Sequence, residues 1–105
     1  MIKELERDDN GNFITDPSFK AILKLDELLK AAGIPHALDK CWDGWRVAYP
    51  CRQRDGNCEI DFIQTGQSYG GKQGFLEMLD WSTDEVEGWL SVEQAFEIIA
   101  ERSSK

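Results

Sequence analysis

The chain has 105 residues, of which 41% are hydrophobic and 30% are charged, and its formal net charge is -8. The length suits one domain with its own core, and the composition excludes the low hydrophobicity of disordered chains. The acidic balance argues against binding of duplex nucleic acid, because a negative surface repels phosphate backbones.

No apolar run approaches the ~20 residues that span a bilayer, and no secretory pattern follows Met1. We therefore expect a cytoplasmic protein with no membrane contact. The three cysteines, Cys41, Cys51 and Cys58, form an odd set without the paired spacing of disulfide frameworks or redox motifs. Reduced thiols are the expectation.

Residues 1–15 are polar and contain an Asn10-Gly11 turn signal, so they are predicted to form an arm before a single domain over residues 16–105. Asp16 and Pro17 are typical of a helix N-cap and first helical position. Apolar residues then recur at steps of three and four up to Ala32, and Gly33 and Pro35 give a stop signal. The pattern predicts a helix over residues 17–32.

Asp43-Gly44 lies between Trp42 and Trp45 and predicts a hairpin with a two-residue turn. The first strand is expected around residues 36–38, and Trp45, Val47 and Tyr49 should share one face of the second strand, which ends at Pro50. A third strand is predicted over residues 58–63, with Glu59 and Asp61 on its solvated face. Together these strands predict an antiparallel three-stranded meander.

Three segments follow in the C-terminal part of the chain. Residues 75–79 are predicted to form a short helix, and residues 86–90 fit either a helical turn or a strand. Ser91 and Gln94 form a capping box that predicts a terminal helix. The predicted fold class is α+β: a two-layer domain in which the three-stranded meander packs against the N-terminal helix and the C-terminal helices.

The run Gly66–Gly74 is rich in glycine and is predicted to connect a strand to a helix. Backbone N–H groups and a helix N-terminus in such a loop can bind an anion, and a lysine would add charge. It is not a Walker A loop, because Gln73 follows Gly71-Lys72 where that motif has Ser or Thr. The alternative is a turn without ligand, in which glycine serves sterics alone.

Aromatic and basic side chains alternate in the charge-neutral middle of the chain, where rings could stack on a base and guanidinium groups could pair with phosphates. Trp45 and Tyr49 are equally consistent with the core of the sheet. The hypothesis requires that Arg46 and the loop containing Arg52 and Arg54 lie close to Lys72 in the folded protein. The predicted ligand-binding residues are Trp42, Arg46, Arg54, Ser68, Tyr69, Gly70, Gly71 and Lys72.

Two further constellations are weaker. His36 and the three cysteines lack the short spacing of structural zinc sites, and a Cys-His catalytic pair has no supporting motif. No metal, cofactor or catalytic residue is therefore predicted. Residues 75–105 contain two basic and eight acidic residues, which could form a negative face that imitates a nucleic-acid backbone, although solvated helix faces explain the same pattern. The eight acids are Glu77, Asp80, Asp84, Glu85, Glu87, Glu93, Glu97 and Glu101.

Several short motifs, Ala32-Gly33-Ile34-Pro35-His36, Asp43-Gly44-Trp45, Tyr49-Pro50 and Gly66–Gly74, occur in order over about three quarters of the chain. In this pattern the chain resembles small uncharacterised proteins encoded by bacteriophages and prophages of Firmicutes. The resemblance implies a counter-defence factor in the host cytoplasm, but no catalytic residues.

The sequence hypothesis is therefore a non-enzymatic, phage-type binding protein that sequesters a small anionic, nucleotide-like immune signal. A homo-oligomer could complete its pocket, because a chain of this length has little room for a deep cavity. The alternative is an inhibitor that binds a bacterial defence effector through the acidic face.

Overall fold

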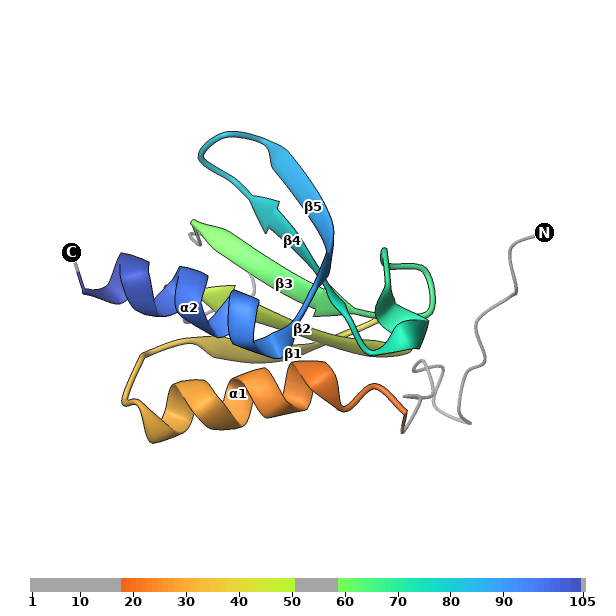
Figure 1. Ribbon diagram of the computed structural model, residues 1–105, viewed down its shortest axis with the longest axis horizontal. Coiled ribbons are helices and arrows are strands. Elements are labelled where there is room, and N and C mark those ends of the chain that lie inside the picture. Colours follow the sequence, from red (N-terminus) through yellow and green to blue (C-terminus); the bar gives the residue numbers. More distant parts are fainter. Residues whose placement is uncertain (1–17, 51–58, 105) are drawn as a thin grey trace.

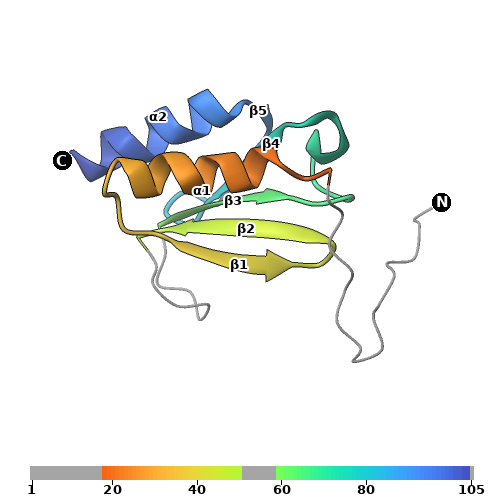
Figure 2. The same cartoon turned by 90° about the horizontal axis from the view of Figure 1, so that it is seen from below.

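The computed structural model describes residues 18–50 and 59–104. Five antiparallel strands form one sheet in chain order, and both long helices lie on the same face of it (Figures 1 and 2). The α+β, two-layer class is confirmed, whereas the prediction of a three-stranded meander is wrong because the sheet has five strands. The elements are α1 (Ala21–Ala31), β1 (Ala37–Cys41), β2 (Gly44–Tyr49), β3 (Ile60–Gln64), the 3-10 helix η1 (Gly71–Gln73), β4 (Leu76–Asp80), β5 (Glu85–Leu90) and α2 (Val92–Ser103).

Helix α1 is the predicted N-terminal helix, but it begins at Ala21 rather than at residue 17. Its N-cap residue, Lys20, makes no side-chain capping bond, and the backbone N–H of Ile22 donates instead to Gln64 Oε1 of β3 at 3.0 Å. The predicted cap, Asp16-Pro17, lies outside the described residues. At the other end Gly33 adopts a φ of 70° and closes the helix as the sequence indicates.

Strands β1 and β2 form the predicted hairpin, but the turn residues differ from the expected pair. Cys41 is paired with Gly44, so Trp42 and Asp43 make the turn and Gly44 belongs to the strand. A Cβ at Gly44 would lie 1.8 Å from the carbonyl oxygen of Gln64. Glycine is therefore required there by the close approach of β3 rather than by the turn.

Strand β4 occupies the segment that was predicted to be a helix. Leu76 and Met78 are buried in the core, and Glu77 and Leu79 alternate with them. The prediction is wrong because a short apolar run fits helix and strand periods almost equally well, and pairing with β3 decides the outcome. Residues 85–90 form β5, so the strand alternative for this segment is the correct one.

Strand β5 is an edge strand and contains a bulge. Leu76 is paired with Leu90 and Met78 with Glu87, so two residues of β5, Gly88 and Trp89, lie opposite one residue of β4. Trp89 has a φ of 59°. A tryptophan in this left-handed conformation is strained, and bulges of this kind redirect a side chain.

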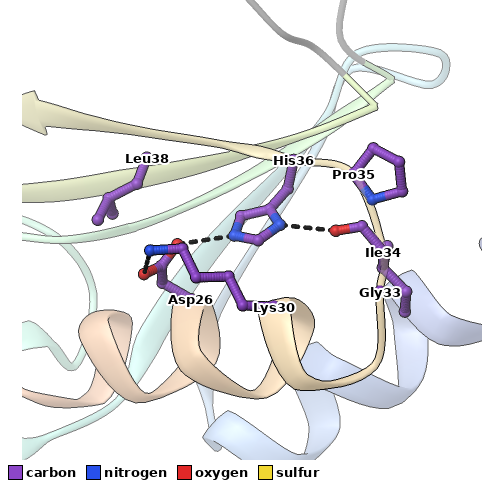
Figure 3. Close-up of a pocket in the computed structure, with 7 residues that line it drawn as sticks. All are labelled: Asp26, Lys30, Gly33, Ile34, Pro35, His36 and Leu38. Carbon is purple, nitrogen blue, oxygen red and sulfur yellow. Dashed lines mark hydrogen bonds and ion pairs between the residues drawn. The ribbon is translucent and has the colours of Figure 1, made fainter.

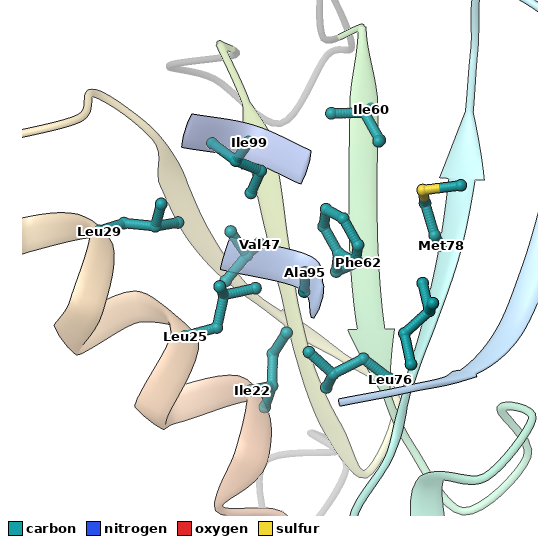
Figure 4. Packing of buried hydrophobic residues seen from close by; sticks show 11 residues of the cluster. Ile22, Leu25, Leu29, Val47, Ile60, Phe62, Leu76, Met78, Ala95 and Ile99 are labelled. Carbon is teal, nitrogen blue, oxygen red and sulfur yellow. The ribbon is translucent and has the colours of Figure 1, made fainter. Parts of the chain in front are cut away.

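Helix α2 begins with the predicted capping box. The Ser91 hydroxyl accepts from the N–H of Gln94, and the Gln94 side chain accepts in return from the N–H of Ser91. Figure 4 shows side chains of both helices converging on those of β2, β3 and β4. The buried cluster consists of Ile22, Leu25, Leu29, Val47, Ile60, Phe62, Leu76, Met78, Leu90, Ala95 and Ile99.

Among the residues that the structure describes, no helix has the length and apolar character to cross a membrane. The predicted arm over residues 1–15 falls outside the described ranges.

Candidate functional site

The glycine-rich run Gly66–Gly74 connects two strands, β3 and β4, and contains only the single turn η1. The prediction that it leads into a helix is therefore wrong. A 3-10 turn of three residues gives no extended helix dipole. The anion-binding hypothesis must then rest on backbone N–H groups and side chains of the loop itself.

Most backbone N–H groups of this run already donate within the protein. The N–H of Gly66 donates to Asp43 Oδ1 at 3.0 Å, and that of Tyr69 donates to Glu77 Oε1 at 3.0 Å. Groups with these partners do not converge on an external anion. Internal acceptors also receive the N–H groups of Gln67, Ser68, Gly71, Gln73, Gly74 and Phe75.

Gln64 fixes the loop to the first helix. Its buried side chain accepts from the N–H of Ile22 at 3.0 Å and donates through Nε2 to the carbonyl oxygen of Gly71 at 2.9 Å. A Cβ at Gly71 would lie 2.2 Å from the carbonyl oxygen of Thr65, so this position also requires glycine. The base of the loop is therefore packed against the buried core.

The structure brings several predicted site residues to one end of the sheet. Asp43, next to Trp42 in the β1–β2 turn, accepts the N–H of Gly66, and the Lys72 side chain reaches the vicinity of Gly66. Trp42 and Tyr69 are 47% and 62% exposed. These residues therefore share one end of the domain.

Arg46 does not join that group. Its Nε donates to Asp61 Oδ2 at 3.2 Å, and its guanidinium also pairs with Asp39. By strand alternation these side chains lie on the face of the sheet opposite the helices, whereas Gln64 and η1 lie on the helix side. Arg54 falls outside the described residues. Asp61 is only 5% exposed and also accepts the Trp81 indole N–H, so its prediction as a solvated acid is wrong.

Three exposed rings, Tyr69, Phe75 and Trp89, form what we term the aromatic cluster. Phe75 and Trp89 have ring centroids 5.8 Å apart in a tilted arrangement. Tyr69 joins them through its carbonyl oxygen, which accepts the N–H of Trp89 at 3.4 Å. Phe75 is 36% exposed and Trp89 is 56% exposed. Grouped exposed rings of this kind are a feature of many interaction surfaces.

Two glycines permit this grouping. A Cβ at Gly70 would lie 3.0 Å from the Trp89 ring and 2.9 Å from the Phe75 Cβ. A Cβ at Gly88 would lie 2.3 Å from the Tyr69 Cβ. The Trp89 ring therefore packs against the backbone of Gly70 in the glycine-rich loop, and Tyr69 packs against the backbone of Gly88 in β5.

Acidic residues border the aromatic cluster. Glu77 accepts the Tyr69 N–H, and Glu87 lies two residues before Trp89. We term the exposed Asp84, Glu85 and Glu87 of the β4–β5 turn and β5 the hairpin acids.

The eight predicted acids do not make one continuous set. Asp80 is buried and pairs with Arg102 of α2, so it does not belong to an exposed negative face. The Ser82 hydrogen bond lowers the pKa of the Asp80 carboxyl, burial opposes this, and Arg102 lowers it further, with a net shift below the ordinary value. The α2 acids Glu93, Glu97 and Glu101 lie on a separate element from the hairpin acids.

A second polar constellation lines an open depression of about 580 Å³ between the end of α1 and β1 (Figure 3). His36 Nε2 lies 2.7 Å from Asp26 Oδ1, and its Nδ1 lies 2.8 Å from the carbonyl oxygen of Ile34. Lys30 Nζ lies 2.9 Å from the other carboxylate oxygen of Asp26. Burial raises the pKa of Asp26, but the hydrogen bonds and charges of His36 and Lys30 outweigh it and hold the pKa below its ordinary value.

This constellation connects the end of α1 to the start of β1. Both ring nitrogens of His36 lie within hydrogen-bond distance of protein oxygens, those of Asp26 and of the Ile34 carbonyl. Over the described parts of the chain, no three His, Cys, Asp or Glu side chains are arranged to hold a metal ion.

Sequence reasoning gave no role to Phe75 and Trp89. The sequence pattern places Phe75 in a short helix and places Trp89 in a segment that fits either a helical turn or a strand. The available signal was Gly88 next to a tryptophan, since glycine inside a strand often marks a bulge or a close approach of another group.

Comparisons with protein-family models, curated proteins and solved structures give no match. The function is accordingly argued from geometry and charge.

Proposed function

We propose that the chain is a protein-binding module that docks a basic surface of another protein. The observation that supports this is the aromatic cluster: three exposed rings, in contact through ring and backbone, packed on glycine and linked to the Glu77 carboxylate through the Tyr69 N–H. Of the two functions inferred from the sequence, this one corresponds to the protein-binding inhibitor. Its binding face is the β4–β5 edge rather than the whole acidic C-terminal third.

Fixed rings suit protein docking energetically. Tyrosine and tryptophan dominate binding energy at protein interfaces, because they bury a large area with few rotatable bonds. Here the contacts with Gly70 and Gly88 hold Trp89 and Tyr69 before any partner arrives. Such preorganisation reduces the entropy lost on association.

The charge around the cluster selects the partner. The hairpin acids are exposed positions of the β4–β5 turn and the edge strand β5, and the chain as a whole has a net charge of -8. A negative surface of this kind accelerates the approach of a basic partner and disfavours acidic ones. A bacterial defence effector, the partner expected under the sequence hypothesis, remains part of this proposal.

The test uses octa-arginine as a basic probe and octa-glutamate as its acidic counterpart, with calorimetric titration at low and high salt. We expect octa-arginine to bind with salt-sensitive affinity and octa-glutamate not to bind. The double variant Glu85→Lys/Glu87→Lys should weaken octa-arginine binding about tenfold, because both reversed charges lie on the edge strand that carries Trp89.

The matched control is Glu97→Lys/Glu101→Lys, which changes the net charge equally but at exposed positions of α2. It should reduce the affinity much less. Equal losses for the two double variants would mean that only net charge matters, and absence of octa-arginine binding to the native protein would also refute the proposal.

A small anionic, nucleotide-like ligand is the second candidate, favoured by the gathering of Trp42, Tyr69 and Lys72 at one end of the domain. Because most loop N–H groups have internal acceptors, such a ligand would depend on the rings and Lys72. Titration with mono-, di- and cyclic nucleotides and ADP-ribose tests this candidate. Binding that is lost in Lys72→Ala and Tyr69→Ala would favour it, and no heat with any nucleotide would exclude it.

A further inference from the structure

Trp89 is the residue of the aromatic cluster whose placement depends most on the fold. It occupies the bulge of β5 with a φ of 59°, a conformation that tryptophan adopts only when its surroundings impose it. Its N–H donates to the Tyr69 carbonyl, which joins the bulge to the glycine-rich loop. Strain of this kind is a feature of positions that aim a side chain at a ligand.

The ring of Trp89 is held from one side. The position of a Cβ on Gly70 would lie 3.0 Å and 3.1 Å from two atoms of the indole, so the ring lies against the backbone of the loop. Phe75 supports it at a tilt of 53° between the ring planes. Since 56% of the residue is exposed, the indole presents a large free surface beside these contacts.

Carboxylates lie on both sides of the bulge along this edge of the sheet. Glu77 is the β4 residue opposite the bulge and accepts the Tyr69 N–H, whereas Glu87 precedes Gly88 on β5 and its pairing with the buried Met78 places it on the helix side of the strand. An indole face is the strongest natural π-surface for a cation, and neighbouring negative charge increases the local concentration of cations. An aliphatic or anionic side chain of a partner would gain nothing from these acids.

We propose that Trp89 receives a cationic side chain of the partner, arginine in preference to lysine, by a cation–π contact on the free surface of its indole. This inference rests on the proposed docking of a basic protein. Arginine is preferred because its planar, weakly hydrated guanidinium stacks on a ring and can still bond to a carboxylate at its edge. Glu77, which lies opposite the bulge and is bonded to the Tyr69 backbone, is the carboxylate available for this.

The test compares octa-arginine binding to the native protein and to Trp89→Leu, Trp89→Phe and Trp81→Leu. Leucine keeps an apolar side chain but removes the π-surface, and should raise the Kd about 2- to 5-fold, as expected for an exposed cation–π contact. Phenylalanine should give an intermediate Kd. Trp81, which is 52% exposed in the β4–β5 turn and donates its indole N–H to Asp61, is the exposed tryptophan outside the aromatic cluster, and Trp81→Leu should raise the Kd less than Trp89→Leu.

A second measurement on the native protein does not depend on whether the variants fold. In a ¹⁵N-labelled sample the indole N–H signals of the four tryptophans can be followed during titration. The Trp89 signal should shift first and furthest, and octa-lysine should produce a smaller shift than octa-arginine.

The outcomes separate the two proposals. If Trp89→Leu binds octa-arginine as tightly as the native protein and the Trp89 indole signal does not move, while Glu85→Lys/Glu87→Lys still weakens binding, then docking stands and the cation–π contact is refuted. If the native protein does not bind octa-arginine, the proposed function fails and this inference fails with it.

Discussion

Gly70 and Gly74 lie in the same loop and both have a positive φ, 81° and 88°, but their surroundings differ. A Cβ at Gly70 would contact Phe75 at 2.9 Å and Trp89 at 3.0 Å, whereas a Cβ at Gly74 would have nothing within 4 Å. Alanine at Gly74 therefore measures backbone strain alone. Alanine at Gly70 measures the same strain together with displacement of the aromatic cluster.

The left-handed conformation costs an L-residue about 1–2 kcal/mol. Overpacking adds about 1–3 kcal/mol where neighbours must move. We expect Gly74→Ala to lower the free energy of unfolding by about 1–2 kcal/mol and Gly70→Ala to lower it by about 2–5 kcal/mol. The difference corresponds to a melting temperature lower by at least about 4 °C for Gly70→Ala.

Urea unfolding followed by far-UV circular dichroism gives both free energies, and the indole N–H signal of Trp89 reports the local geometry. Gly70→Ala should shift that signal and Gly74→Ala should leave it in place. Equal destabilisation by the two substitutions, with an unchanged Trp89 signal in both, would refute the packing of the indole on Gly70.

Three further outcomes follow from other contacts. Gln64→Ala removes both long-range hydrogen bonds of a fully buried amide and should destabilise the protein by about 2–4 kcal/mol in urea unfolding, while the exposed Gln67→Ala should stay within about 0.5 kcal/mol. Ser91→Ala removes a helix cap and should cost about 1 kcal/mol by the same measurement. Because the folded pKa of Asp26 is below its unfolded value, its stabilisation is present above about pH 4 and is lost as pH falls through the folded pKa. Unfolding at several pH values should therefore show the stability difference between the native protein and Asp26→Asn narrowing below about pH 4, and a constant difference would contradict this assignment.

Local patterns predicted the helices well because each has an amphipathic stripe and a chemical stop or start. Ile22, Leu25 and Leu29 are buried as their spacing indicates, and the Ser91 capping box forms. The start of α1 was misplaced, because its first turn is satisfied by Gln64, which is distant in sequence. A side chain that caps a helix from another strand leaves no local signal.

Only some of the predicted site residues lie together in the structure, for a related reason. Trp42, Tyr69 and Lys72 gather because turns at the same end of a sheet are close whatever the register. Arg46 depends on register, since its cross-strand neighbours on the open face are Asp39 and Asp61, and a shift by one residue would have reversed its direction. The sequence alone does not specify which residue of β3 pairs with which residue of β2.

The glycine-rich loop shows how a correct signal can have another physical meaning. Its glycines indicate a backbone that something approaches closely, and an external phosphate was the natural hypothesis. In the folded protein the approaching groups are internal: the Trp89 ring at Gly70, and at Gly71 the carbonyl oxygen of Thr65. The loop N–H groups are then used by the protein's own acceptors, so whatever the loop contributes to recognition must pass through the rings that it positions. Because those rings are exposed and the Glu77 carboxylate is bonded to the Tyr69 backbone, a basic surface is the ligand that we propose for them.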